Sequence, residues 1–205
     1  VPQQSATKLA GLWGPLLREV SERSGCTLSF RTAPNIPEFE KRLANGEYDF
    51  AYMNPYHYTV FGEVPGYVAF GRARDRQIKG IMVVRRDSPI QSMEELKGAK
   101  LAFPAPAAFA ATLLPQSTLR LADIPFDPSY VSSHDSVYRA VAKGLYPAGG
   151  GIVRTLNNVD PSVREQLRVL WTSDGFTPHA FARHPNVPRT VADRVSQAFY
   201  DLDKG

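Results

Sequence analysis

The chain has 205 residues, of which 43% are hydrophobic, and a formal net charge of +4 at pH 7. This length and apolar fraction predict a globular protein of one or two domains with a packed core. The basic residues are scattered rather than gathered into a stripe, which excludes nucleic acid as the expected partner and favours a small anionic molecule.

Helices and strands are expected to alternate along the first 77 residues. Apolar residues recur at helical spacing after Ser5, so we predict a helix with Ser5 as its N-cap and Gly25 as its C-terminal stop. Pro15 within this run predicts a kink or a later start. Strands are expected at 26–32, 48–53 and 67–70, and a short helix at 37–44.

The alternation continues to the C-terminus. Strands are expected at 80–84, 100–103, 130–131, 146–148 and 167–172. Helices are expected at 93–96, 104–114, 132–142 and 152–156. A final helix is expected to begin at Pro188 and to run to about residue 202. We interpret the run Gly149-Gly150-Gly151 as a helix-starting turn rather than as a point where the backbone approaches a ligand closely.

This order predicts an α/β protein with two lobes and a ligand cleft between them. Lobe 1 is expected to comprise residues 1–77 and 173–205, and lobe 2 residues 78–172. The chain would then cross between lobes twice, with Thr177-Pro178-His179 at the second crossing, which is typical of a hinge.

The single cysteine, Cys26, excludes an internal disulfide and is expected to be a structural thiol at the start of a strand. No stretch is apolar enough to cross a bilayer, and no signal peptide opens the chain. Both ends, Val1-Pro2 and residues 201–205, look abrupt. We therefore interpret the chain as a processed or trimmed piece of a longer protein.

Aromatic, amide and imidazole side chains cluster at residues 48–58. Asn54-Pro55 should end the strand there, because proline lacks an N–H group, and ligands bind at such strand ends in open α/β sheets. Strand alternation prevents all of these side chains from facing one ligand, so Asn54 and Tyr56 are the first candidates and Tyr52 the next. The alternative is that the tyrosines only cover a core.

Several segments together carry a family pattern: 46–51 (GEYDFA) with 54–56 (NPY), 84–90 (VRRDSPI), 96–103 (LKGAKLAF) and 133–137 (SHDSV) with 140–144 (AVAKG). This combination resembles the PhnD-like family of type II periplasmic solute-binding proteins, which bind phosphate, phosphite and phosphonate. The resemblance covers nearly the whole chain. It implies a periplasmic or otherwise extracytoplasmic receptor that captures a small oxyanion between two lobes, performs no chemistry, and usually serves an ABC importer.

The resemblance also implies a ligand contact at His134, and Ser133 beside it is a further candidate; both lie at the start of a helix capped by residues 132–136. A helix N-terminus attracts anions and disfavours protonation of the imidazole, which would leave a neutral donor. In the alternative, Ser132, Ser133 and Asp135 cap the helix without a ligand and His134 only packs. Gln4 and Ser5, which follow what we interpret as a truncated first strand, are further candidates, although Ser5 could be an ordinary N-cap.

Two departures from the family bear on the ligand. The phosphonate binders carry a Ser-Thr-Ser cluster where this chain has Ala108-Phe109-Ala110, so hydroxyls that hold phosphonate oxygens are missing and Phe109 suggests a partly organic ligand. Binders of amine-bearing phosphonates place an acidic residue near the position of Gly149–Gly151. Glycine cannot pair with the ammonium group of such a ligand, so an aminophosphonate is disfavoured here.

Alternative functions are a ligand-sensing domain of a signalling system, with a sensor kinase as partner instead of the importer's membrane subunits, and an enzyme. Nucleophile and phosphate-loop motifs are absent from the sequence, so we expect no catalytic residues and no cofactor. His57, His134 and His179 lack the spacing of a metal site, so we expect no metal. We expect a monomer.

Overall fold

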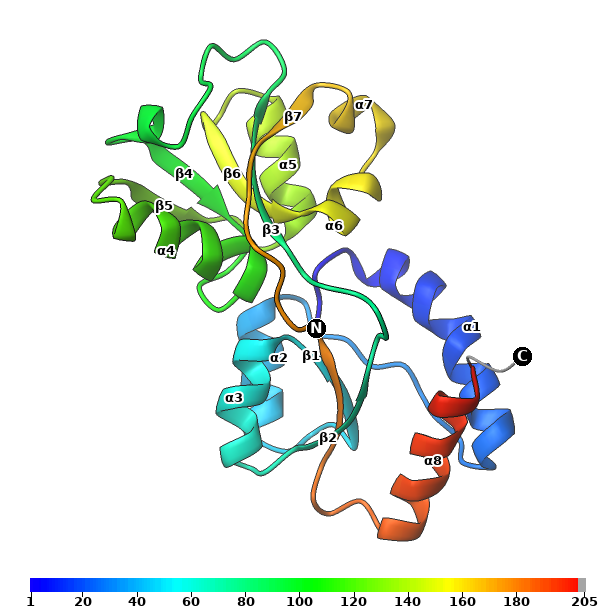
Figure 1. Cartoon of the computed structure of the whole chain (residues 1–205). Helices are drawn as coiled ribbons and strands as arrows, with labels where there is room; N and C mark the ends of the chain where they lie inside the picture. Colours follow the sequence, from blue (N-terminus) through cyan, green and yellow to red (C-terminus); the bar gives the residue numbers. More distant parts are fainter. Residues whose placement is uncertain (203–205) are drawn as a thin grey trace. The chain divides into compact units, whose positions relative to one another are not determined.

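The computed structural model describes residues 1–202 and divides into two compact units (Figure 1). Unit 1 comprises Val1–Arg76 and the chain from Pro178 onward, and unit 2 comprises Gln77–Thr177. The first boundary lies one residue before the expected end of lobe 1, and the second lies five residues after the expected end of lobe 2. Residues 203–205, part of the abrupt C-terminal end, lie outside the described residues.

Unit 1 is built on a three-stranded antiparallel sheet in the order β1-β8-β2. Its strands are β1 (Phe50–Met53), β2 (Val68–Arg72) and β8 (Ala180–Arg183). Its helices are α1 (Ala6–Ser24), α2 (Ile36–Ala44), α3 (Pro55–Glu63) and α8 (Arg189–Asp201).

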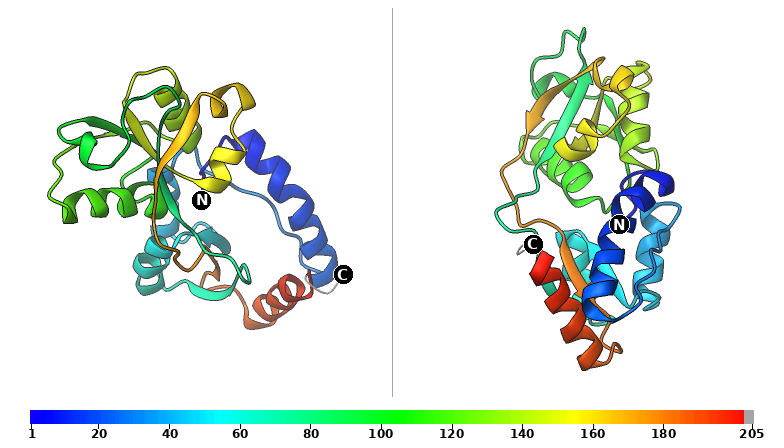
Figure 2. Two further views of the ribbon diagram at one scale, coloured as in Figure 1. Left: turned by 45° about the horizontal axis from the view of Figure 1, so that its top comes forward. Right: turned by 90° about the vertical axis from the view of Figure 1, so that its right-hand side faces the viewer.

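Alternate residues of β1 serve two hydrophobic layers. Ala51 and Met53 pack with residues of α2 and α3, whereas Phe50 packs with residues of α1 and α8. The two outer helices α1 and α8 pack against each other (Figure 2). This strand therefore has helices on both faces, as in an α/β layer structure.

The termini of α1 match the prediction, because Ser5 is the N-cap and Gly25 ends the helix in the left-handed conformation, with φ 63°. The later start suggested by Pro15 was wrong, since α1 is helical from Ala6 through Pro15 to Ser24. The strand expected at 26–32 was also wrong, since these residues join no described ladder. Strand β8 was not predicted.

Unit 2 contains a five-stranded sheet in the order β5-β4-β6-β3-β7. The strands are β3 (Gly80–Arg85), β4 (Lys100–Phe103), β5 (Asp127–Tyr130), β6 (Ala148–Ile152) and β7 (Leu167–Thr172). The helical segments are η1 (Glu94–Leu96), η2 (Phe109–Leu113), α4 (Leu114–Leu121), α5 (His134–Ala142), α6 (Val153–Asn157) and α7 (Pro161–Arg164). The predicted helix at 104–114 begins later, because residues 104–108 are not helical and η2 is a π-helical turn that leads into α4.

The interior strand β3, which lies between β6 and β7, is buried on both faces. Ile81 and Val83 pack in the cluster that contains α5, and Met82 and Val84 pack in the cluster on the side of α4. All four side chains are 0% exposed. The uninterrupted apolar run that predicted this strand thus reflects helices on both sides of the sheet (Figure 1).

The prediction of a turn at Gly149-Gly150-Gly151 was wrong, because all three glycines lie inside β6. A Cβ atom at Gly149 would lie 2.5 Å from Val137 Cγ1, one at Gly150 would overlap the carbonyl oxygen of Ala111, and one at Gly151 would overlap the Tyr138 hydroxyl. Glycine is needed here because η2 and α5 approach the strand closely, which is a packing role rather than a turn or a ligand contact.

We predict that Gly150→Ala lowers the free energy of unfolding by about 3 kcal/mol, because the new methyl group meets a backbone carbonyl that cannot move alone. Urea denaturation of both chains measures this loss. Gly11→Ala in α1 is the control, since its Cβ would meet nothing within 4 Å and helix propensity should stabilise it by about 1 kcal/mol. Equal stability of the two variants would contradict the packing role.

Candidate functional site

Four of the predicted site residues form two groups at helix N-termini, one in each unit. Ser133 and His134 begin α5 in unit 2, and Asn54 and Tyr56 lie at the start of α3 in unit 1. Both helices have nine residues, and both are capped by a side-chain oxygen. Each N-terminus therefore presents backbone N–H groups and a positive dipole end.

Ser133 caps α5 in the expected manner. Its hydroxyl accepts a hydrogen bond from the Ser136 backbone N–H at 3.1 Å and lies 2.9 Å from the Ser136 hydroxyl. Ser132 precedes it with φ 78°, a left-handed conformation that turns the chain from β5 into the helix. The cap explains Ser133 without a ligand, so a ligand contact of Ser133 remains a prediction.

His134 is held by a buried network of hydroxyl groups that the sequence did not reveal. Its Nδ1 lies 2.9 Å from Thr155 Oγ1, which lies 2.7 Å from the Tyr138 hydroxyl. That hydroxyl accepts from the Ile152 N–H and lies 3.1 Å from the Ile152 carbonyl oxygen. The imidazole orientation is thereby fixed, and no hydrogen bond to Nε2 occurs within residues 1–202.

Burial keeps the His134 imidazole neutral. The side chain is 1% exposed, and desolvation lowers its pKa to about 3, with a smaller contribution from the positive charge of Arg154. The direction agrees with the neutral donor expected from the sequence, but the main cause is burial rather than the helix dipole. Thr155 has one hydroxyl hydrogen and can donate it to Nδ1 or to the Ile152 carbonyl oxygen, which lies 3.1 Å from Oγ1. Donation to Nδ1 leaves the ring hydrogen on Nε2, whereas donation to Ile152 leaves it on Nδ1 and makes Nε2 an acceptor.

Asn54 has a structural role at the start of α3. Its Oδ1 accepts a hydrogen bond from the His57 backbone N–H at 2.7 Å, which makes Asn54 the N-cap, and it is 3% exposed. His57 Nε2 lies 2.9 Å from Glu40 Oε1, a partner supplied by α2. Burial lowers the pKa of His57, whereas the Glu40 carboxylate acts in the opposite direction. The helix that follows Pro55 was not predicted.

The other candidates of unit 1 differ in exposure. Tyr56 is exposed, with 43% of its surface accessible, whereas Tyr52 is partly buried. The ring of Tyr52 stacks on that of His179, with ring centroids 4.9 Å apart. Gln4 is 7% exposed, and Ser5 is the exposed N-cap of α1. Tyr52 therefore belongs to an aromatic layer, while ligand contacts for all four residues remain predictions.

Ala108 and Phe109 stand where η2 begins. Ala108 is 4% exposed, and Phe109 packs edge-on against Phe176 with ring centroids 5.5 Å apart. The first N–H groups of a helical segment lack intrahelical acceptors, so this turn offers backbone donors although it lacks hydroxyls at 108–110. Nearby, Thr112 Oγ1 is buried and has no hydrogen-bond partner among residues 1–202. The sequence signal for this polar group is a threonine inside an alanine-rich run.

Within residues 1–202, no group of three or more His, Cys, Asp or Glu side chains could hold a metal ion. His57 and His179 belong to unit 1 and His134 to unit 2. A helix of the length and hydrophobicity required to span a membrane is likewise not found in this part of the chain.

Because the pKa of His134 is lowered on folding, its contribution to stability is complete above the unfolded value of 6.5 and is lost as the pH falls toward 3. Between pH 7 and pH 5 this loss amounts to about 2 kcal/mol. We predict that His134→Asn removes this part of the pH dependence. Urea denaturation at both pH values tests the prediction, and an unchanged pH dependence in the variant would contradict it.

Comparisons with known proteins place these features in a family. The family model described as "ABC transporter, phosphonate, periplasmic substrate-binding protein" matches residues 1–205. A phosphate-import protein PhnD of Mycolicibacterium smegmatis is 22% identical over 231 residues, which covers 97% of this chain and 69% of that protein.

Solved structures show the same fold. The binding component of an ABC phosphonate transporter from Pseudomonas aeruginosa has a TM-score of 0.86 at 16% identity, with 98% of this chain and 72% of that chain covered. PhnD1 of Prochlorococcus marinus, in complex with methylphosphonate, has a TM-score of 0.85 at 15% identity, with 98% of this chain and 80% of that chain covered.

A histidine kinase sensor domain that is similar to periplasmic binding proteins has a TM-score of 0.63 at 19% identity, with 93% of this chain and 79% of that chain covered. The α/β fold with two sheets thus agrees with the predicted type II periplasmic-binding-protein architecture. Since the family model spans the whole sequence, the chain belongs to the family of phosphonate-binding periplasmic substrate-binding proteins of ABC transporters.

Proposed function

We propose that this chain binds a small phosphorus oxyanion, with a phosphonate as the favoured ligand, and that His134 and the N-terminus of α5 supply the contacts from unit 2. The observation that carries the proposal is the neutral, buried imidazole of His134, which Thr155 holds in place at the first residue of a capped helix. Asn54 and Tyr56 at the start of α3 are the proposed contributors from unit 1. The expectation that both units share one ligand remains a prediction.

Charge and desolvation both favour an anion at the start of α5. An anion near α5 gains from the helix dipole and from first-turn N–H groups, and a neutral Nε2–H donates to it without a competing positive charge. Each hydrogen bond made in a desolvated site adds about 1 kcal/mol or more. This contact requires Thr155 to donate its hydrogen to Nδ1 rather than to the Ile152 carbonyl oxygen, because only then does the ring hydrogen lie on Nε2.

The residues at η2 support a phosphonate over inorganic phosphate. Where the family's phosphonate binders have hydroxyls, this chain has the buried Ala108 and the aromatic Phe109, so fewer donors are available for the oxygens of a phosphorus oxyanion, and the ring of Phe109 favours a ligand with an organic substituent.

The proposed activity is binding and release without chemical change of the ligand. The proposed partner is the membrane part of an ABC importer, with the receptor acting as a monomer in the periplasm or another extracytoplasmic space. The second candidate, a ligand-sensing domain, is favoured by the fold shared with a histidine kinase sensor domain. The gene neighbourhood and the sequence of the complete protein distinguish the two.

The test is a thermal-shift measurement with methylphosphonate, phosphite and phosphate, each at millimolar concentration, and with sulfate at equal ionic strength. We predict that methylphosphonate raises the melting temperature most, because a ligand of the native state stabilises it by mass action. His134→Ala should abolish this shift.

His184→Ala is the matched control, because it removes another imidazole, one that hydrogen-bonds the Asn186 N–H in unit 1. It should retain the full shift. Circular dichroism without ligand checks that both variants fold. A folded His134→Ala variant with an unchanged shift would remove His134 from the site, and a shift with sulfate alone would overturn the ligand class.

A further inference from the structure

Two phenylalanines of unit 2 meet at the edge of its sheet where His134 also lies. Strands β4, β5 and β6 are parallel, so their carboxyl ends share one edge, and the chain leads there from β5 to His134 and from β4 to Phe109. Strand β3 runs opposite to β6, so its first residues lie at this edge as well. Phe176 bridges to Ile78, just ahead of β3. We call Phe109 and Phe176 the aromatic pair.

The aromatic pair is anchored on both sides. Phe176 and Ile78 each donate a backbone hydrogen bond to the carbonyl oxygen of the other, both at 2.9 Å. The two phenylalanine rings meet edge-on, with centroids 5.5 Å apart and an interplanar angle of 85°. Phe109 in turn packs against the buried cluster of Ile78, Ala110 and Ile152. Contact with a ligand would therefore cost little side-chain entropy.

Apolar surface remains accessible at this edge of the sheet. Phe176 is 39% exposed in spite of its contacts, and Val153, which begins α6 directly after β6, is 46% exposed. Single exposed apolar side chains are ordinary in proteins. These two lie at the carboxyl edge of parallel strands, where α/β sheets bind ligands, and an inorganic anion would gain nothing from them. The surface therefore suits the organic part of a ligand.

Positive charge is found on the His134 side of this surface. The guanidinium of Arg154 lies close enough to His134 to contribute to the lowering of its pKa, after the larger effect of burial. The aromatic pair itself carries no charge. A ligand with an oxyanion at one end and an apolar group at the other matches this division.

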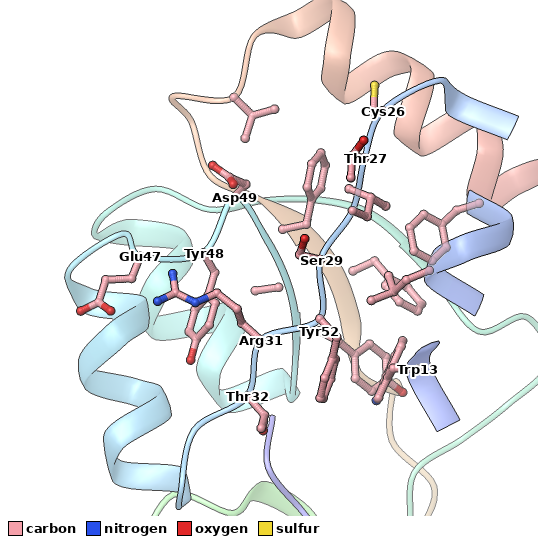
Figure 3. A pocket seen from close by; sticks show the side chains of 18 of the residues that line it. Trp13, Cys26, Thr27, Ser29, Arg31, Thr32, Glu47, Tyr48, Asp49 and Tyr52 are labelled. Carbon is pink, nitrogen blue, oxygen red and sulfur yellow. The ribbon is translucent and has the colours of Figure 1, made fainter. Parts of the chain in front are cut away.

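A competing apolar site lies in unit 1. Figure 3 shows a cavity of about 440 Å³ between residues 26–32 and β1, which we call the β1 cavity. Trp13 of α1 is one of the aromatic residues that line it. Asn54 and Tyr56, the proposed anion contacts of unit 1, do not line it. The β1 cavity therefore lacks the link to an anion site that the aromatic pair has.

We infer that the aromatic pair is the subsite for the organic substituent of the ligand, and that this substituent is an aromatic ring. The inference rests on the proposed function, because it requires the oxyanion at His134. The ligand ring would cover the exposed part of Phe176, displace water from it and add a third ring to an edge-on pair, an arrangement that aromatic rings favour. Phe176 is thus a specificity-determining residue that does not touch the phosphonate oxygens.

The test is isothermal titration calorimetry with phenylphosphonate and methylphosphonate. We expect phenylphosphonate to bind the unaltered chain about tenfold more tightly, because its ring buries more apolar surface. Phe176→Ala should reduce this ratio to about two and leave the affinity for methylphosphonate unchanged. The matched control is Tyr200→Ala, which removes an aromatic ring of α8 that is 61% exposed. It should keep the full ratio.

The two ligands separate this inference from the proposed function. If methylphosphonate binds and phenylphosphonate binds no more tightly, the aromatic subsite is overturned and the proposed function stands. If neither ligand binds, both fail. Cyclohexylphosphonate binding as tightly as phenylphosphonate would contradict the preference for an aromatic ring.

The variants distinguish a specificity role from a structural one. Equal losses of affinity for both ligands in Phe176→Ala would assign Phe176 to the stability of the chain beside it and overturn the inference. A ratio that is lost in Trp13→Ala and kept in Phe176→Ala would place the ligand ring in the β1 cavity instead.

Discussion

No side chain larger than a hydrogen atom fits at three consecutive positions of β6, where α5 and η2 pack against the sheet of unit 2. Because Gly151 leaves room for the Tyr138 hydroxyl, this group reaches both the N–H and the carbonyl oxygen of Ile152. Tyr138 and Thr155 in turn hold the ring of His134. The orientation of the proposed binding residue thus depends on the absence of side chains on a neighbouring strand.

Burial then determines the charge of that residue. Protonated His134 would be a cation without a carboxylate partner in its hydrogen-bond network, and desolvation suppresses this form. His57 differs because Glu40 contacts its ring and partly opposes the desolvation. Two buried histidines of similar exposure therefore have different surroundings, one composed of hydroxyls and one containing a carboxylate.

Local signals in the sequence predicted what is local in the structure. Ser5 and Ser133 were predicted as helix caps because capping needs only a few neighbouring residues, and β3 was predicted from an uninterrupted apolar run. The role of the β6 glycines and the network around His134 could not be predicted, because they depend on contacts between segments far apart in the sequence. Residues 26–32 have strand composition, but a strand also needs a partner, and composition does not reveal whether one is present.

The proposed function requires Nε2 of His134 to donate a hydrogen bond to a phosphorus oxyanion. Nitrogen-15 NMR of the imidazole rings during a methylphosphonate titration tests it most directly, because it reports the tautomer and the contact at one residue. We predict a neutral His134 ring with hydrogen on Nε2 and a saturable shift of that nitrogen upon binding. A ring with hydrogen on Nδ1, or binding that leaves the His134 signals unchanged, would contradict the account.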